Sequence, residues 1–286
     1  MQTLLKPIEK DLGGFSVGRL LPAAAMRSIG PFVFLDRMGP ADFAPGSGID
    51  VRPHPHIGLA TVTWLFEGAL LHRDSLGFVQ RIEPGAVNWM IAGNGIVHSE
   101  RSDPADRAAG HRLDGMQAWV ALPRAAEDIA PSFVHVPADR LPAIDDAGVR
   151  LRLVAGDAFG LRSPVPVHSP MFYAEATFRP GARLQLPALH PERGIYLAAG
   201  SLEVDGEPLH VRHLAVPVHG RAALLHSPDG CTAMLLGGEP PDGERHLWWN
   251  FVASSRERID AAKERWRAQT MGRVPGETEF IPLPDR

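Results

Sequence analysis

The sequence predicts an all-β protein that consists of two tandem small β-barrels of the jelly-roll type, followed by an amphipathic helix. The 29 Gly and 27 Pro residues are scattered between short apolar runs, which is typical of β proteins with many turns. A pattern of aromatic, Leu, two residues, Gly, one residue and Leu occurs at 64–70 and again at 196–202, an offset of 132. A repeat of this length indicates duplication of a whole barrel. We therefore expect one domain over 1–135 and a second over 136–286.

The expected strands of the first half are short apolar runs that are separated by Gly, Pro and Asp. They lie at residues 32–36, 61–66, 69–73, 87–91, 96–100 and 115–123. Glu67-Gly68 is expected to close a hairpin between the second and third of these runs. The polar stretch 101–113 is expected to be a loop that overhangs the mouth of a site, and 123–146 to connect the two domains.

In the second half, Asp205-Gly206 predicts a hairpin turn between apolar runs. A capping-box pattern at 254–257 then predicts the start of a helix. In that helix Ile259, Ala262 and Trp266 share one face, so the helix is expected to pack on a barrel. Residues 270–286 form a polar, proline-containing tail.

The bulk composition excludes several classes of function. Apolar residues make up 44% and charged residues 22% of the chain, and the net charge is −4 without a basic stripe, so no nucleic-acid interface is expected. No apolar run approaches the roughly 20 residues of a membrane span, and no signal peptide is recognisable. The single Cys231 cannot form an internal disulfide and is expected to be a core residue rather than a nucleophile. Together these features favour a cytoplasmic protein.

Two pairs of polar residues have the spacing of metal ligands on strands. His54 and His56, and likewise His98 and Glu100, are separated by two positions, so each pair lies on one face of an extended strand. Three imidazoles and one carboxylate are a plausible ligand set for a divalent transition metal. The alternative is that His54-Pro55-His56 is a chance pair on a solvated strand. The even-numbered residues that follow His56, up to Phe66, are all small or apolar. This pattern favours a histidine pair that faces the interior, if no bulge intervenes.

The second barrel lacks this pattern. The offset of 132 places Leu186 and Ala188 at the positions of the first histidine pair, and His226-Ser227 echoes His98-Ser99 but is followed by Pro228. His190 and Glu192 could be argued as a displaced pair. We expect the second domain to be a degenerate copy of a metal-binding first domain.

The motifs of the first barrel resemble the signature of the pirin family, which are bicupins of the cupin superfamily. The resemblance is dense from about 51 to 122 and covers the segments His54-Pro55-His56-Ile57-Gly58, His72-Arg73-Asp74-Ser75-Leu76-Gly77 and residues 84–100. It implies two tandem cupin domains, with iron or a related metal held by the first. The implied ligands are His54, His56, His98 and Glu100.

The resemblance also implies a chemistry. The metal is expected to be Fe(2+), although nickel, cobalt, manganese, copper or zinc suit the same donors. Four ligands leave an octahedral metal with two open positions, which suits a flavonol such as quercetin together with dioxygen. The implied activity is that of a quercetin 2,3-dioxygenase, in which Glu100 is also the catalytic base.

Other residues of the first barrel are open to more than one interpretation. His72 is either a donor that supports a ligand, a substrate contact, or a histidine that is satisfied in the core or by solvent. A further four residues are candidates for an apolar wall of the site, or else for the core: Trp64, Phe66, Trp89 and Met90.

Two alternatives to the enzyme remain at this point. Pirin-family proteins are also described as regulators that bind a protein partner, and a change between Fe(II) and Fe(III) would alter the charge of the site by one unit. A metal-free structural bicupin is the third hypothesis. Loss of flavonol absorbance in air would favour the enzyme, and elemental analysis would test for the metal.

Overall fold

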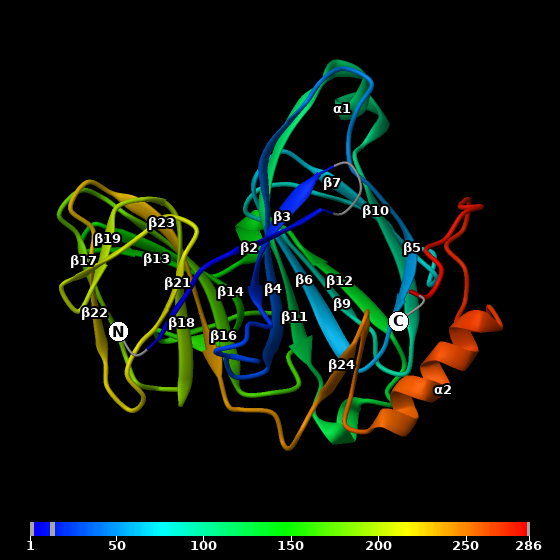
Figure 1. Ribbon diagram of the computed structural model, residues 1–286. Helices are drawn as coiled ribbons and strands as arrows, with labels where there is room; N and C mark the ends of the chain where they lie inside the picture. Colours follow the sequence, from blue (N-terminus) through cyan, green and yellow to red (C-terminus); the bar gives the residue numbers. More distant parts are fainter. Residues whose placement is uncertain (1–2, 12–14, 285–286) are drawn as a thin grey trace. The chain divides into compact units, whose positions relative to one another are not determined.

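The computed structural model describes residues 3–11 and 15–284 (Figure 1). These residues form mostly β-strands, with two α-helices, α1 (Pro104–Ala109) and α2 (Arg256–Arg267), and two short 3-10 turns. The predicted all-β class and the helix near the carboxyl terminus are therefore confirmed. Within the described part of the chain, neither helix is long and apolar enough to cross a membrane.

The chain forms two compact units, which we call the N-terminal barrel and the C-terminal barrel. Among the described residues, the N-terminal barrel comprises 11, 15–17, 38–138 and 241–284, and the C-terminal barrel comprises 3–10, 18–37 and 139–240. The boundary at 138/139 lies close to the expected one at 135/136. Both units also take segments from the other end of the chain, which local sequence patterns do not indicate. The assignment of 1–135 and 136–286 as domains stays a prediction.

The N-terminal barrel contains a large and a small sheet. The large sheet has the order β12-β9-β6-β11-β4-β3-β2, and the small sheet has the order β5-β10-β7-β8. The strands of the large sheet are β12 (Ser132–Val136), β9 (Val87–Ile91), β6 (Leu59–Glu67), β11 (His111–Ala121), β4 (Phe32–Phe43), β3 (Ser16–Leu21) and β2 (Ile8–Asp11). The chain passes from one unit to the other within β2, β3 and β4. Those of the small sheet are β5 (Asp50–His56), β10 (Ile96–Arg101), β7 (Leu70–Asp74) and β8 (Val79–Ile82).

The C-terminal barrel repeats this arrangement. Its large sheet has the order β1-β21-β18-β23-β16-β14-β13, with β15 (Leu161–Arg162) paired to β14, and its small sheet has the order β17-β22-β19-β20. The large sheet comprises β1 (Thr3–Leu5), β21 (Leu214–Val216), β18 (Glu192–Gly200), β23 (Cys231–Gly238), β16 (Met171–Phe178), β14 (Val149–Ala158) and β13 (Ala143–Asp146). The small sheet comprises β17 (Arg183–Leu186), β22 (Ala223–His226), β19 (Leu202–Val204) and β20 (Glu207–Leu209).

The repeated sequence pattern falls on equivalent strands. Trp64 lies on β6 and Tyr196 on β18, each strand lies between two neighbours of its large sheet, and both side chains are fully buried. Cys231 lies in the apolar core of the C-terminal barrel, where burial raises the pKa of its thiol. Its predicted role as a core residue is confirmed.

One of the two predicted hairpins is present. Asp205 and Gly206 have φ values of 54° and 82° and join β19 to β20, with Leu202 opposite Leu209. The hairpin at Glu67-Gly68 is wrong, because β6 belongs to the large sheet and β7 pairs with β10 and β8 of the small sheet. The turn at Gly68 therefore passes the chain from one sheet to the other.

The polar stretch 101–113, which was expected to be a loop, contains α1 and the start of β11. Asp103 caps this helix by accepting a hydrogen bond from the backbone amide of Ala105 at 2.9 Å, and Pro104 occupies the first helical position. A cap of this kind, followed by Gly110, was a readable signal that the expectation overlooked.

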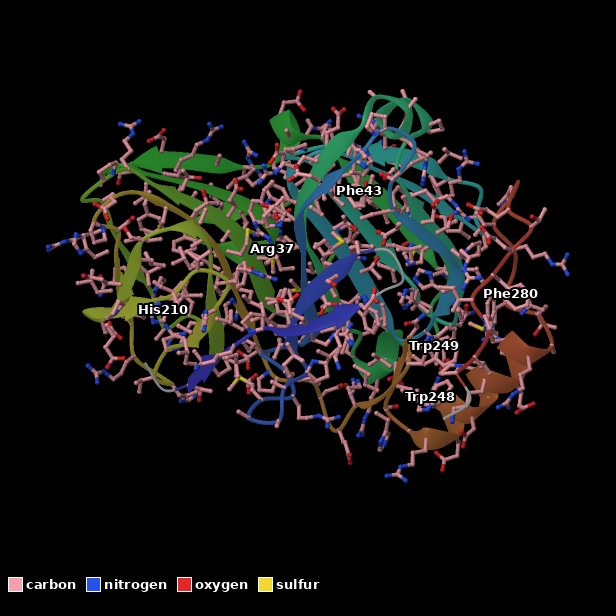
Figure 2. The ribbon with its side chains drawn as sticks, turned by 45° about the horizontal axis from the view of Figure 1, so that its top comes forward. Arg37, Phe43, His210, Trp248, Trp249 and Phe280 are labelled. Carbon is pink, nitrogen blue, oxygen red and sulfur yellow. The ribbon has the colours of Figure 1, made fainter. Side chains whose placement is uncertain are left out.

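Helix α2 packs on the N-terminal barrel as its periodicity predicts. Ile259, Ala262 and Trp266 are buried in one cluster with Trp248 and Trp249, and Figure 2 shows the two labelled tryptophans next to this helix. The helix is capped by Ser255, one residue later than the capping box at 254–257 indicates. The shift has a physical cause, because the hydroxyl of Ser254 donates to the buried Glu127 at 2.6 Å.

A candidate metal centre in the N-terminal barrel

Three neighbouring strands of the small sheet bring polar side chains to one face. His98 of β10 lies opposite His54 of β5 on one side and opposite Asp74 of β7 on the other. Residues two positions away on each strand share that face. The six side chains are all buried, with exposed fractions of 7% for His54, 1% for His56, 4% for His72, 0% for Asp74, 1% for His98 and 8% for Glu100.

Two glycines allow the backbone to deliver the ligand strands. Gly58 follows β5 with a φ of +66°, and a Cβ there would lie 2.0 Å from the carbonyl oxygen of Val252. Gly93 precedes β10 with a φ of +50°, and a Cβ there would lie 2.1 Å from the carbonyl oxygen of Ile129. Only glycine fits such close approaches at positive φ.

The three predicted histidine ligands converge. His54, His56 and His98 each offer a ring nitrogen such that the three atoms lie within 4.8 Å of one another. The Nε2 atoms of His56 and His98 are 3.1 Å apart, and the rings of His54 and His98 have centroids 4.4 Å apart. This group could hold a metal ion.

Backbone carbonyls orient two of the imidazoles. His54 Nδ1 donates to the carbonyl of Arg52 at 2.9 Å, and His56 Nδ1 donates to the carbonyl of Asn250 at 3.0 Å. Because a carbonyl oxygen only accepts, the proton of each neutral ring is at Nδ1 and the lone pair is at Nε2. Both lone pairs are therefore available to a cation.

The buried position keeps these rings neutral. Burial lowers the pKa of His54 to about 4, opposed by its hydrogen bond to the Arg52 carbonyl. Burial lowers the pKa of His56 and of His98 well below the ordinary value, and the neighbouring His54 adds to the effect in both. A neutral imidazole is the form that binds metals.

Glu100 lies on the same face but is held slightly apart. The group of mutually close ligand atoms among the described residues comprises the three histidines and does not include its carboxylate. Thr63 Oγ1 lies 3.3 Å from Glu100 Oε1 and 3.1 Å from Gln117 Oε1, and its single proton serves one of them at a time. Burial raises the pKa of Glu100. A β-bulge between His98 and Glu100 in the pairing with β5 accompanies this displacement.

We expected the even-numbered residues from His54 to Phe66 to face the same side as His54 and His56, and this expectation is wrong. The chain leaves β5 at Gly58 and enters β6 in the other sheet, so the phase is reset. The odd residue Thr63 faces Glu100 and lies opposite Gln117 of β11. Hence the neighbouring Trp64 projects to the opposite face of β6.

The alternation of side chains along a strand also shows which residues of the proposed apolar wall face the site. Met90 lies opposite Thr61, so it projects to the side of the site, whereas Trp64 and Trp89 project to the other side of the large sheet. Phe66 is partly buried and lies at an irregularity in the pairing of β6 with β11, so the alternation does not assign it to either side. Two aromatic residues of the site were missed by sequence reasoning. The ring of Trp119 lies edge-on to His56 with centroids 5.1 Å apart, and the ring of Phe133 stacks on His72 at 4.3 Å.

His72 and Asp74 were also missed as a pair. His72 Nδ1 lies 3.4 Å from His98 Nδ1, and His72 Nε2 lies 2.9 Å from Asp74 Oδ2. They have the same spacing of two positions as the two ligand pairs. That shared spacing on a third strand was the signal in the sequence.

Both halves of the chain are similar to known proteins. A family model described as Pirin matches residues 14–120, and one described as Pirin C-terminal cupin domain matches residues 173–272. A pirin-like protein of Caulobacter vibrioides is 53% identical over 282 residues, which cover 96% of each chain. The chain belongs to the pirin family.

A further relative and a solved structure are similar to most of this chain. Pirin of Mus musculus is 28% identical over 257 residues, 87% of this chain and 85% of the mouse protein. The crystal structure of quercetin 2,3-dioxygenase from Acinetobacter baumannii matches with a TM-score of 0.90 and 33% identity, over 99% of this chain and 96% of that one. The predicted bicupin of the pirin family is confirmed.

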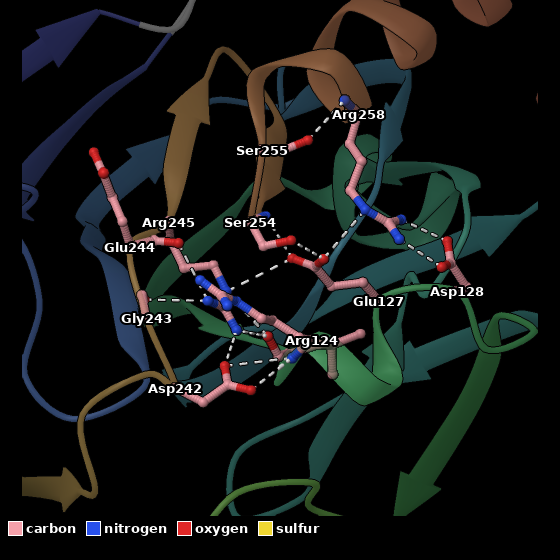
Figure 3. A network of polar contacts seen from close by, with 11 residues as sticks. Arg124, Glu127, Asp128, Asp242, Gly243, Glu244, Arg245, Ser254, Ser255 and Arg258 are labelled. Carbon is pink, nitrogen blue, oxygen red and sulfur yellow. Dashed lines mark hydrogen bonds and ion pairs between the residues drawn. The ribbon is translucent and has the colours of Figure 1, made fainter.

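In this pirin-family chain, the segment that carries Asn250 is fixed by a polar network (Figure 3). The buried Glu127 accepts hydrogen bonds from the backbone amide and the hydroxyl of Ser254, both at 2.6 Å. Arg245 and Arg258 approach the same carboxylate at 3.6 and 3.5 Å. The network holds the returning segment 241–258 against the barrel and so places the carbonyl that orients His56.

The tail after α2 supports the other ligand strand from outside (Figure 1). Ser99 Oγ donates to Glu277 at 2.9 Å, and Arg101 donates to both carboxylate oxygens of Glu277 at 3.0 and 2.5 Å. Ser99 and Arg101 alternate with His98 and Glu100 along β10, so the tail contacts the outer face of the strand whose inner face carries the site. The described part of the predicted polar tail, 270–284, is thus a docked element.

Proposed function

We propose that this protein binds one divalent transition metal, Fe(2+), through His54, His56, His98 and Glu100, and that it oxygenates flavonols in the manner of a quercetin 2,3-dioxygenase. The observation that carries the proposal is the convergence of three buried, neutral imidazoles, two of which direct an Nε2 lone pair to the common centre. Unpaired buried acceptors that face one another are unfavourable unless a cation lies between them.

The donor set fits such a metal. Three imidazole nitrogens and one carboxylate suit iron and its neighbours, and a six-coordinate ion held by these four residues would keep coordination sites free for substrate oxygens or dioxygen. When bound, the metal supplies a Lewis acid and a redox centre. Glu100 reaches the group by turning from Thr63 and, as a carboxylate, can also accept the proton of the flavonol hydroxyl.

The surroundings suit a flat aromatic substrate. Trp119 contacts His56, and Phe133 and Met90 lie opposite one another on the same side of the large sheet. Aromatic and apolar side chains around a few convergent polar groups are typical of small-molecule sites. The Acinetobacter baumannii relative that carries the quercetin 2,3-dioxygenase name supports this substrate class.

The test begins with elemental analysis of protein that was purified anaerobically without an affinity tag. Flavonols are then added in air, and oxygen uptake and loss of flavonol absorbance are recorded. We expect about one metal per chain and turnover of quercetin. His98→Ala is expected to lose both metal and activity together, because it removes one of three close ligands. His226→Ala, in the C-terminal barrel, is the control that keeps both.

Each failure has a distinct meaning. Full metal content in His98→Ala would contradict the ligand assignment. A metal-loaded protein that does not consume any flavonol would contradict the dioxygenase and favour the redox-sensing regulator, whose affinity for a protein partner is expected to follow the oxidation state of the metal.

A further inference from the structure

The N-terminal barrel contains a third pair of polar residues that the proposed metal site does not use as ligands. His72 and Asp74 lie on β7, beside the strand of His98, and are 4% and 0% exposed. His72 is not a member of the group of close ligand atoms, since its Nδ1 faces Nδ1 of His98 rather than the Nε2 atoms. It therefore contacts a ligand without being one.

Asp74 is fixed on both of its oxygens. Its Oδ1 accepts hydrogen bonds from the backbone amides of Leu76 and Phe78 at 2.9 and 3.1 Å, and its Oδ2 lies 2.9 Å from His72 Nε2. The two amides orient the carboxylate so that its second oxygen can only face the imidazole. A carboxylate only accepts, so His72 Nε2 donates to it.

The ring of His72 is fixed in turn. It stacks on Phe133 with centroids 4.3 Å apart and planes 13° apart. With the proton at Nε2, the neutral ring presents the Nδ1 lone pair to His98 at 3.4 Å. A His98 ring that donates from Nδ1 has its own lone pair at Nε2, where the three imidazoles converge.

We propose that His72 and Asp74 are positioning residues that hold His98 in its metal-binding tautomer through a carboxylate–imidazole–imidazole chain. This rests on the proposed metal site. His54 and His56 are oriented by neutral carbonyls, whereas His98 is oriented by a chain that ends in a carboxylate. Such outer partners fix the ring and raise the basicity of the ligand. The chain ends at the fully buried Asp74, so it is a support rather than a proton path to solvent.

The variant Asp74→Asn tests the chain with little change of shape. If the amide oxygen keeps both backbone amides, the amide nitrogen faces His72 Nε2, so either two donors face each other or His72 takes the other tautomer and no longer accepts from His98. We expect the affinity for Zn(II), measured by competition with a chelator, to fall about tenfold to hundredfold. Arg73→Gln is the matched control on the same strand, because Arg73 projects to the opposite face, and its affinity is expected to stay within about twofold.

A second pair of variants tests the same chain even if Asp74→Asn does not fold. His72→Phe keeps the stack on Phe133 but has no acceptor for His98, so it is expected to lose affinity to a similar extent. His72→Asn offers an amide oxygen near the former Nδ1 position and is expected to recover a part of the loss relative to His72→Phe. Thermal unfolding of the metal-free variants separates loss of fold from loss of affinity.

The tautomer itself can be observed by nitrogen-15 NMR of the Zn(II)-loaded wild-type protein. We expect His72 to be protonated at Nε2 and His98 at Nδ1. Protonation of His72 at Nδ1, or Zn(II) affinities of Asp74→Asn and His72→Phe within about twofold of the wild type, would overturn the proposal. Neither readout requires turnover, so a protein without dioxygenase activity would still support or refute this role.

Discussion

The two small sheets of this protein share their strand order but differ in the buried row of residues that runs across their first three strands. In the N-terminal barrel the row across β5, β10 and β7 is His54, His98 and Asp74. In the C-terminal barrel, the row across β17, β22 and β19 that contains the fully buried Leu225 is Leu184, Leu225 and Val204. The residues of this row are all apolar: Leu225 and Val204 belong to the core of the C-terminal barrel, and the partly buried Leu184 packs against that core.

The comparison shows what a polar row requires. The apolar row is satisfied by packing against its own barrel. The polar face to which this row belongs also carries His56 and Glu100, and it takes partners from distant segments, namely the Asn250 carbonyl for His56 and the large-sheet residue Thr63 for Glu100. The barrel frame is therefore independent of the site, and the site depends on additional supports.

The largest expected effect comes from placing a polar residue into the apolar row. Leu225 is fully buried, and its barrel offers no matching set of partners for an imidazole at this position among the described residues. We expect Leu225→His to lower the free energy of unfolding by about 3 kcal/mol, measured by chemical denaturation. The adjacent Leu224 is 45% exposed, so Leu224→His is the control, with a change below about 0.5 kcal/mol. Equal stability of the two variants would break the comparison.

The histidine cluster was predictable from the sequence for a local reason. Side chains two apart on a strand share a face, so His54, His56, His98 and Glu100 were recognisable in pairs. The converging strands followed from the family resemblance. The fold class and the degenerate second copy came from the repeat at an offset of 132.

The supports were not predictable, because they depend on contacts between distant segments. Asn250 contributes a backbone carbonyl, which no side-chain pattern reveals, and Glu277 is 178 positions from its partner Ser99. Likewise, the phase of β6 could not be read through Gly58, since the sequence does not show that the chain changes sheets there. The His72 and Asp74 pair was readable by spacing, but its role required the distances to His98.

A smaller effect is expected at the tail that supports the polar row from outside. The hydrogen bonds from Arg101 hold the pKa of Glu277 below its ordinary value of 4.5. A carboxyl whose pKa is lower in the folded state adds stability above its unfolded pKa and loses it as the pH falls through the folded value. We expect Glu277→Gln to reduce the free energy of unfolding by about 1 kcal/mol at pH 7. The difference from wild type is expected to close as the pH falls below the ordinary value of 4.5 and through the lowered pKa of the folded state.

Denaturation curves at a series of pH values measure this effect. The control is Glu279→Gln, because Glu279 also accepts from Arg101 but its side chain is 52% exposed, so a change below about 0.5 kcal/mol is expected. If the free energy of unfolding of Glu277→Gln differs from that of the wild type by the same amount at neutral and at acidic pH, the charge of Glu277 does not stabilise β10.

The smallest expected effect concerns the contact between the large sheet and Glu100. At the offset of 132, Thr63 corresponds to Ile195, which is fully buried in the apolar core of the C-terminal barrel. Thr63→Val therefore makes this position resemble the second barrel while it nearly keeps the volume. Glu100 then retains Gln117 but loses the Thr63 hydroxyl. We expect metal affinity, measured by chelator competition, to fall about threefold to tenfold, since a partner that orients the carboxylate is lost.

The control for this change is Thr61→Val, on the same strand and face and two positions away. The side-chain partners of Glu100 are Thr63 and Gln117, so this substitution leaves them in place. If both valine variants weaken metal binding equally, the loss comes from altered packing of β6 and not from Glu100. If only Thr63→Val weakens it, the large sheet contributes to the site through one hydroxyl, and that hydroxyl is one more way in which the polar row differs from its apolar counterpart.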